Sequence, residues 1–158
     1  MKKVLIALDY NPTAQKIAEK GYTLAKSMNA QTTLLHVISD AAYYSSDIYS
    51  PLMGFDSFTD FKSIETASPE ELREAALDYL DKSKQHLNDN NIQTVVKEGD
   101  FGERIIETAA EINADIIVMG THSRRGLEKI LVGSVAEKVL RHSKIPLFII
   151  PAKIFEEK

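Results

Sequence analysis

The segment Val118–Lys138, VMGTHSRRGLEKILVGSVAEK, joins an apolar strand to a helix through a long polar loop. The apolar run ends at Gly120, and a helical pattern starts again at Gly133 and Ser134. Glycine lets a backbone approach a ligand closely. A helix N-terminus adds unpaired N–H groups and the positive end of its dipole. The segment therefore predicts a strand–loop–helix unit of an α/β protein whose loop wraps a phosphate chain.

Outward from this unit, apolar runs that predict strands alternate with segments of helical spacing. The predicted strands are Lys3–Asp9, Gln31–Ile38, Ile92–Glu98, Asp115–Gly120 and Pro146–Pro151. Apolar residues that recur every three to four positions predict helices over Thr13–Met28, Ser68–Leu87, Asp100–Ile112 and about Ser134–His142. Such alternation implies parallel strands joined by right-handed crossovers. We expect one doubly wound α/β domain over residues 1–158, with a five-stranded parallel sheet and helices on both faces.

Two of the predicted helices carry clear start signals. Ser68, Pro69 and Glu71 form the pattern of a capping box, with proline at the first helical position. Asp100 is followed by Glu103 in the same spacing. In doubly wound sheets, ligands bind beyond the carboxyl ends of strands, where the strand order reverses. Residues directly after strands are therefore the first candidates for a site.

The segment of about residues 39–67 is an insertion without clear periodicity. It spans 29 residues and holds six of the twelve aromatic rings of the chain. Unstructured loops of this length are uncommon and are often lids or binding loops. Because aromatic residues are rare in disordered segments, we expect the insertion to pack against its own domain, a partner subunit or a ligand.

Composition narrows the class of protein. The chain has no cysteine, which fits a reducing compartment, and no apolar run long enough to span a membrane. The start is too short and too polar for a signal peptide. The formal net charge of −4 disfavours general nucleic-acid binding. These features favour a cytoplasmic protein.

Charge is unevenly distributed along the chain. Residues 121–144 hold six basic and two acidic residues, a local charge of +4. The later lysines fit a solvated helix face, whereas Arg124 and Arg125 lie in the loop bounded by glycines, where an anion partner is more plausible. Spacing alone leaves two alternatives open, an ordinary turn at Gly120 and an ordinary helix cap at Ser134.

Other ligand motifs are missing from the sequence. There is no GxxxxGK[ST] motif and no GxGxxG after the first strand. His36 lies inside a strand and is expected to be a satisfied core or edge histidine. A divalent ion such as Mg²⁺ would bind through the phosphates of the ligand and a carboxylate, and Asp9 is the carboxylate we nominate.

The stretch GTHSRRGLEKILVGSVAEKVLRHSKIPLFII resembles the C-terminal signature of the universal stress protein family, and ALD, LLHVIS and DIIVMG resemble its strands. The resemblance covers the chain except the insertion, and it implies an adenine nucleotide alpha hydrolase-like fold. The ATP-binding branch of the family carries G-x2-G-x9-G-[ST]. Here that frame falls on Gly120, Ser123, Gly133 and Ser134. Ser123 replaces a glycine, and its side chain could crowd the phosphates or donate a hydroxyl to them.

The resemblance also implies roles for individual residues. Asp9 would lie by the ribose or adenine, Val37 would offer backbone to the adenine, and Met119 would border the ring. Backbone N–H groups near the start of the last helix would meet the phosphates. Alternatively, Asp9 caps the first helix or turn, and Val37 and Met119 are core. The expected nucleotide-binding residues are Ala7, Leu8, Asp9, Val37, Met119, Gly120, Ser123, Arg124, Gly133, Ser134, Val135 and Ala136.

Three functions follow as hypotheses. The first is a stress-response binding or signalling module that holds ATP, or ADP or AMP, with or without Mg²⁺. The second is a slow ATPase or self-phosphorylating protein, and the third is an interaction module without nucleotide. We favour binding because no motif positions a general base or a catalytic triad. The resemblance further implies a homodimer paired through the apolar strand Pro146–Pro151, since an exposed apolar edge would otherwise invite aggregation.

Overall fold

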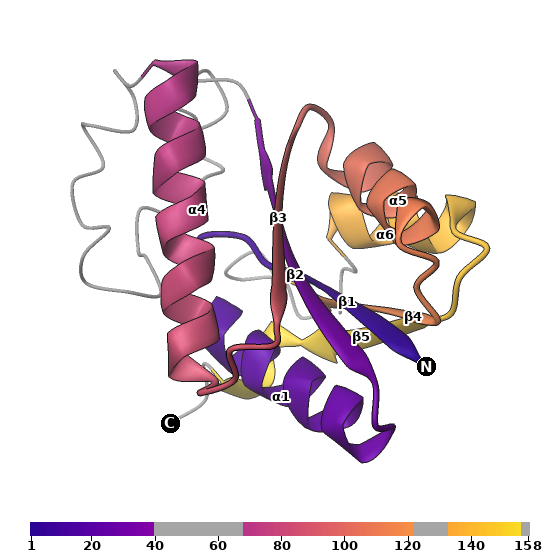
Figure 1. The fold of residues 1–158 in the computed structure, drawn as a ribbon. Coiled ribbons are helices and arrows are strands. Elements are labelled where there is room, and N and C mark those ends of the chain that lie inside the picture. The colour runs from indigo at the N-terminus through magenta and orange to yellow at the C-terminus, as the bar shows by residue number, and fades with distance from the viewer. Residues whose placement is uncertain (40–67, 122–132, 156–158) are drawn as a thin grey trace.

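The computed structural model describes residues 1–39, 68–121 and 133–155. A parallel sheet runs through the centre, and helices cover both of its faces (Figure 1). The doubly wound α/β class predicted from the sequence is confirmed. In the part of the chain described here, no helix is long and apolar enough to cross a membrane.

The elements follow each other in the predicted order. The strands are β1 (Lys3–Ala7), β2 (Gln31–Ile38), β3 (Gln93–Glu98), β4 (Ile116–Thr121) and β5 (Leu147–Pro151). The helices are α1 (Ala14–Ser27), α4 (Pro69–His86), α5 (Phe101–Glu111), α6 (Ser134–His142) and the short 3-10 helix η2 (Ala152–Phe155).

The strand order is β3-β2-β1-β4-β5, and each neighbouring pair of strands in this sheet is parallel. From β1 the chain first moves outward to β2 and β3, then returns to the other side of β1 for β4 and β5. The order therefore reverses between β1 and β4. Ile6 pairs with Val118 across this junction, so the carboxyl ends of β1 and β4 lie side by side.

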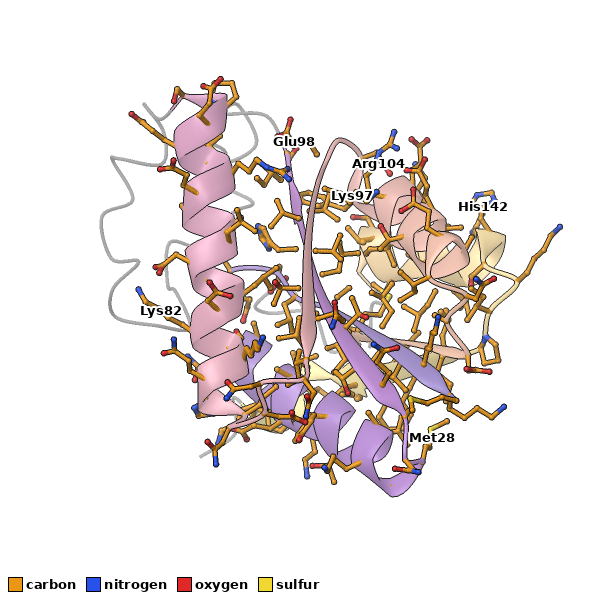
Figure 2. The ribbon with its side chains drawn as sticks, in the orientation of Figure 1. Met28, Lys82, Lys97, Glu98, Arg104 and His142 are labelled. Carbon is orange, nitrogen blue, oxygen red and sulfur yellow. The ribbon has the colours of Figure 1, made fainter. Side chains whose placement is uncertain are left out.

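Two apolar cores fill the space between the sheet and its helices. On one face, α1 and α4 bury residues such as Ile17 and Leu80 against the sheet. On the other face, α5 and α6 bury residues such as Ile105 and Val139. Polar side chains such as Lys82 and His142 lie on the outer sides of the helices (Figure 2). The central strands β1, β2 and β4 are buried on both faces, which explains their almost continuous apolar sequence.

Asparagine ends three of the helices. Asn29, Asn88 and Asn113 follow α1, α4 and α5 with φ of 51°, 53° and 56°. After glycine, asparagine is the residue that most readily takes this left-handed conformation at a helix end. The backbone N–H of Ala114 then donates to the carbonyl of Ala109 at 2.8 Å, which closes the end of α5.

Some predicted boundaries are wrong by one or two residues. Asp9, Ile92, Asp115 and Pro146 were expected in strands but lie just outside them. Asp115 instead uses its carboxylate to accept the backbone N–H of Lys3 at 2.8 Å. The capping box is confirmed, because Ser68 and Glu71 each accept the other's backbone N–H. The aromatic rings of the insertion lie outside the described residues.

Helix α1 lies unusually close to the sheet. A Cβ on Gly21 would sit 2.9 Å from both Ile6 Cδ1 and Val118 Cγ1. A Cβ on Gly120 would sit 2.7 Å from Ile17 Cδ1. Both glycines are thus needed so that α1 can pack onto β1 and β4.

We predict that Gly21→Ala destabilises the fold. Overpacking a well-filled core typically costs about 1–3 kcal/mol, which exceeds the gain of up to about 1 kcal/mol from the better helix propensity of alanine. Urea denaturation should show a lower midpoint for this variant. Lys20→Ala, at an exposed position of the same helix, should leave the midpoint almost unchanged. A Gly21→Ala protein as stable as the wild type would contradict the close approach of α1.

Candidate functional site

The turn after β1 presents Asp9 at the carboxyl edge of the sheet. The Asp9 Oδ1 atom accepts the backbone N–H of Asn11 at 3.0 Å, and Asn11 Oδ1 in turn accepts the backbone N–H of Thr13 at 3.0 Å. Asp9 therefore caps the turn, as one of the two sequence interpretations proposed. Its side chain is also exposed, next to the point where the strand order reverses. Capping the turn and meeting a ligand are compatible for a carboxylate with two oxygens.

The backbone of Val37 faces the space beyond the end of β1. The last described ladder bond between β1 and β2 runs from Leu8 N to Leu35 O at 2.8 Å. Backbone groups two residues apart in a strand point to the same side. The N–H and C=O of Val37 therefore point toward β1, where β1 has already turned away.

The predicted site residues divide between the two faces of the sheet. The side chains that join the core beneath α5 and α6 are those of Ala7, Val37, Met119, Val135 and Ala136. Leu8 belongs to the opposite core, beneath α1 and α4. The structure thus places the first five of these predicted residues on the same face of the sheet. Val37 and Met119 are buried in the core, so a ligand at this edge would meet them through their backbone and not through their side chains.

Gly120 has a different role from the one expected. The sequence interpretation gave it a turn and left room beside it for a ligand. In the structure Gly120 lies inside β4, and the space beside it is occupied by Ile17 of α1. Glycine is required here because of helix packing. The loop that follows, including Ser123 and Arg124, lies outside the described residues.

Helix α6 begins where the sequence predicted. Gly133 is its N-cap residue and Ser134 its first helical residue, and the Gly133 carbonyl accepts the Glu137 N–H at 2.9 Å. Among the described residues no side chain caps this end, and the first N–H groups point out of the helix, as at any α-helix start. Ser134 is exposed. The helix end has the dipole and the donors of an anion site.

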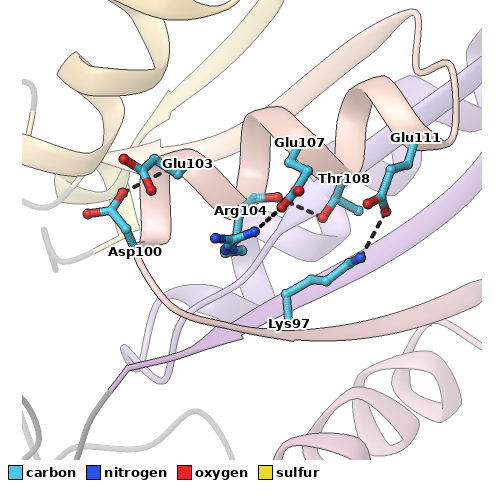
Figure 3. Close-up of polar contacts among 7 residues, drawn as sticks. All are labelled: Lys97, Asp100, Glu103, Arg104, Glu107, Thr108 and Glu111. Carbon is cyan, nitrogen blue, oxygen red and sulfur yellow. Dashed lines mark hydrogen bonds and ion pairs between the residues drawn. The ribbon is translucent and has the colours of Figure 1, made fainter.

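A second polar region follows β3, and its side chains form hydrogen bonds and ion pairs with one another. Asp100 Oδ1 caps α5 by accepting the Glu103 N–H at 3.0 Å, and it also accepts Lys138 Nζ of α6 at 3.0 Å. The Glu103 N–H is the main cause that lowers the pKa of Asp100. Figure 3 shows that the rest of α5 carries further ion pairs, such as Lys97 with Glu111 at 2.8 Å. This region ties α5 to α6 and β3.

A cluster of buried rings packs beneath the turn between β1 and α1, on the core side of that turn. Tyr10 stacks on His36 with ring centroids 4.2 Å apart, and Tyr79 meets both rings edge-on at 4.9 and 5.8 Å. All three side chains are at most 3% exposed. His36 Nδ1 lies 2.8 Å from the carbonyl of Leu8, so it carries the proton and donates.

His36 is therefore a core residue, as expected, but it is only half satisfied. Its Nε2 atom is buried without a hydrogen-bond partner among the described residues. Burial lowers the pKa of His36 from 6.5 to about 4, against the opposing effects of the Leu8 carbonyl and the Asp9 charge. The ring is neutral at physiological pH. Sequence reasoning missed this cluster because Tyr10 and Tyr79 are far apart in the chain.

Residues 1–151 match the Universal stress protein family. Universal stress protein MJ0577 of Methanocaldococcus jannaschii is 33% identical over 158 aligned residues, which cover 96% of each chain. Universal stress protein YxiE of Bacillus subtilis is 26% identical and is aligned over 94% of this chain and 97% of its own.

Solved structures give the same result. The structure of hypothetical protein MJ0577 superposes with a TM-score of 0.68 at 26% identity, covering 95% of both chains. A universal stress protein from Arabidopsis thaliana with AMP bound reaches 0.58 at 21% identity, over 96% of this chain and 92% of that one. A universal stress protein in complex with cAMP also reaches 0.58 at 21% identity, over 96% and 97%. The chain belongs to the universal stress protein family.

We predict that acid destabilises the fold through His36. Between about pH 6.5 and 4 the His36 ring binds a proton in the unfolded chain but not in the folded protein. The free energy of unfolding therefore decreases as the pH is lowered through this window. A lowering from 6.5 to about 4 corresponds to a total of about 3 kcal/mol.

Urea denaturation across this range of pH measures the effect. His36→Asn removes the titrating ring and places an amide donor near the Nδ1 position, so its stability should vary less with pH than that of the wild type. His142→Asn, at an exposed histidine, should keep the slope of the wild type. Equal slopes for His36→Asn and the wild type would rule out a buried neutral histidine.

Proposed function

We propose that this chain binds an adenine nucleotide, ATP or its relatives ADP and AMP, and acts as a stress-response binding module. One observation carries the proposal. The exposed Asp9 carboxylate follows β1, which lies beside β4 in the sheet. The helix that comes after β4 in the sequence is α6, and its N-terminus is at Gly133 and Ser134. The position is the reversal of strand order, where ligands bind in sheets of this kind.

The residues at this edge suit the parts of such a ligand. The Asp9 carboxylate would accept hydrogen bonds from ribose hydroxyls while it still caps its turn. The backbone of Val37 would meet the adenine, and the first N–H groups of α6 would meet phosphate. The phosphates would bring Mg²⁺ where one is bound, with Asp9 as the protein carboxylate. Relatives of the same fold hold AMP and cAMP, which supports an adenine ligand.

The first test identifies the ligand. Protein purified without added nucleotide is denatured and the released small molecules are identified, while calorimetry measures binding of ATP, ADP and AMP with and without Mg²⁺. We expect stoichiometric adenine nucleotide in the release, or binding at micromolar affinity. Phosphate release in the same samples separates binding from slow hydrolysis. No release and no binding would leave an interaction module without nucleotide.

A substitution at the start of α6 tests the phosphate contact. Ser134→Pro removes the N–H and the hydroxyl that would meet a phosphate, yet proline suits the first helical position and Gly133, at ψ 157°, suits the residue before proline. We expect affinity for ATP to fall about tenfold or more, the effect of losing a hydrogen bond to a charged group. Ser134→Ala, which keeps the N–H, should lose less. Unchanged affinity in Ser134→Pro would place the phosphates elsewhere.

We also propose that two copies of the chain pair along β5. In the described sheet β5 is an edge strand, and Phe148 in its middle is 42% exposed. An apolar edge of this kind is stable in solution when another strand covers it. Sedimentation velocity at micromolar concentration should show a dimer, and Phe148→Asp should shift it toward monomer. A wild-type protein that sediments as a monomer would exclude this pairing.

A further inference from the structure

Two consecutive carbonyl groups in the turn after β1 are held by buried side chains from distant parts of the chain. The Leu8 carbonyl accepts His36 Nδ1 of β2 at 2.8 Å. The Asp9 carbonyl accepts the Tyr79 hydroxyl of α4 at 2.6 Å. Tyr79 is separated from Asp9 by 70 residues of sequence. Within a sheet such carbonyls would accept N–H groups of a neighbouring strand, but here β1 has left the ladder.

The two donors have little freedom to move. The rings of Tyr10, His36 and Tyr79 pack on each other in one cluster, and each is almost fully buried. The carbonyl of Leu8 fixes the proton of His36 on Nδ1, because a carbonyl can only accept. A buried carbonyl that loses its donor is costly. The cluster therefore fixes the backbone direction on either side of the Asp9 side chain.

The same segment is fixed from its other end. The Asp9 carboxylate accepts the Asn11 N–H at 3.0 Å, and the Asn11 side chain accepts the N–H and hydroxyl of Thr13 at 3.0 and 2.8 Å. His36 and Tyr79 hold the backbone on either side of the Asp9 side chain, and the Asn11 N–H holds one carboxylate oxygen. Asp9 therefore has one orientation at the edge of the sheet. A ligand that meets such a carboxylate need not order it on binding.

We propose that Tyr79 and His36 are positioning residues of the nucleotide site, which hold the turn after β1 so that Asp9 is presented to the ligand. This inference rests on the proposed function. It also gives α4 a part in binding, although α4 contributes no side chain to the predicted site. By linkage, a nucleotide that binds at Asp9 stabilises the contact between Tyr79 and the turn.

The matched test compares two tyrosines. Tyr79→Phe removes the hydroxyl that holds the Asp9 carbonyl and keeps the ring. Tyr22→Phe removes a hydroxyl that donates to Asp89 Oδ2 at 2.7 Å, between α1 and the turn that leads into β3. That turn precedes β3 and so lies at the amino ends of the parallel strands, whereas Asp9 lies at their carboxyl ends. Both substitutions delete one short hydrogen bond between a tyrosine and an oxygen, but only one of them lies under the site.

Calorimetry measures the affinity of each variant for AMP and ATP, and urea denaturation measures its stability. We expect Tyr79→Phe to weaken nucleotide binding about five- to tenfold, a typical coupling between two sites, while Tyr22→Phe binds as the wild type does. His36→Asn, which keeps a donor near the Nδ1 position, should bind better than His36→Val, which has none. Equal affinities for Tyr79→Phe and Tyr22→Phe would overturn the proposal.

A measurement without ligand separates this inference from the proposed function. Hydrogen exchange of the Asn11 amide reports whether Asp9 is held, because that amide donates to the Asp9 carboxylate. Exchange should be faster in Tyr79→Phe than in Tyr22→Phe. If the wild type binds no nucleotide but this difference is found, the proposed function fails and the positioning of the turn stands. If the difference is absent, the positioning role fails whether or not nucleotide binds.

Discussion

The close contact of α1 with the middle of the sheet is the constraint on which the candidate site depends. Gly21 lets the helix approach Ile6 and Val118, and Gly120 receives the side chain of Ile17. These contacts span the junction of β1 and β4, where the order of strands reverses. A helix that stood farther from the sheet would carry the turn before it away from the end of β4. The distance between the Asp9 turn and the end of β4 is thus set by packing on the face opposite to α6.

The two faces of the sheet contribute differently to the site. The face under α5 and α6 supplies the helix N-terminus and the core residues nearest to it. The face under α1 and α4 supplies support: glycine contacts in the middle and the cluster of Tyr10, His36 and Tyr79 beneath the turn. Lys138 of α6 forms ion pairs with Asp100 and Glu103 at the start of α5. Since both pairs are exposed to solvent, they contribute little to stability and serve more to orient α6 relative to α5.

Much of the fold was predictable because its signals are local. Strands buried on both faces are written as apolar runs, and the capping box at Ser68 states where α4 begins. The rule that ligands bind after strands also led to Asp9 and to the start of α6. Boundaries were less certain because strand ends depend on the neighbouring strand. The apolar run of the first strand continues to Leu8, and the strand was predicted to reach Asp9, but β1 ends at Ala7. The helix η2 was not predicted, since its four residues are too few to show a period.

The sequence could not show which group each of these side chains contacts in the folded protein. A glycine at the end of a strand suggests room for a ligand, yet Gly120 makes room for Ile17, and only the packed helix reveals this. Likewise, a tyrosine among the apolar residues of a helix is counted as core. The hydroxyl of a buried tyrosine, however, needs a partner, and the partner of Tyr79 is a backbone carbonyl that has no signature in sequence. His36 follows the same logic with the added demand of one tautomer. Buried polar groups of this kind are therefore where a structure adds most to a sequence, because each of them must point to the group it serves.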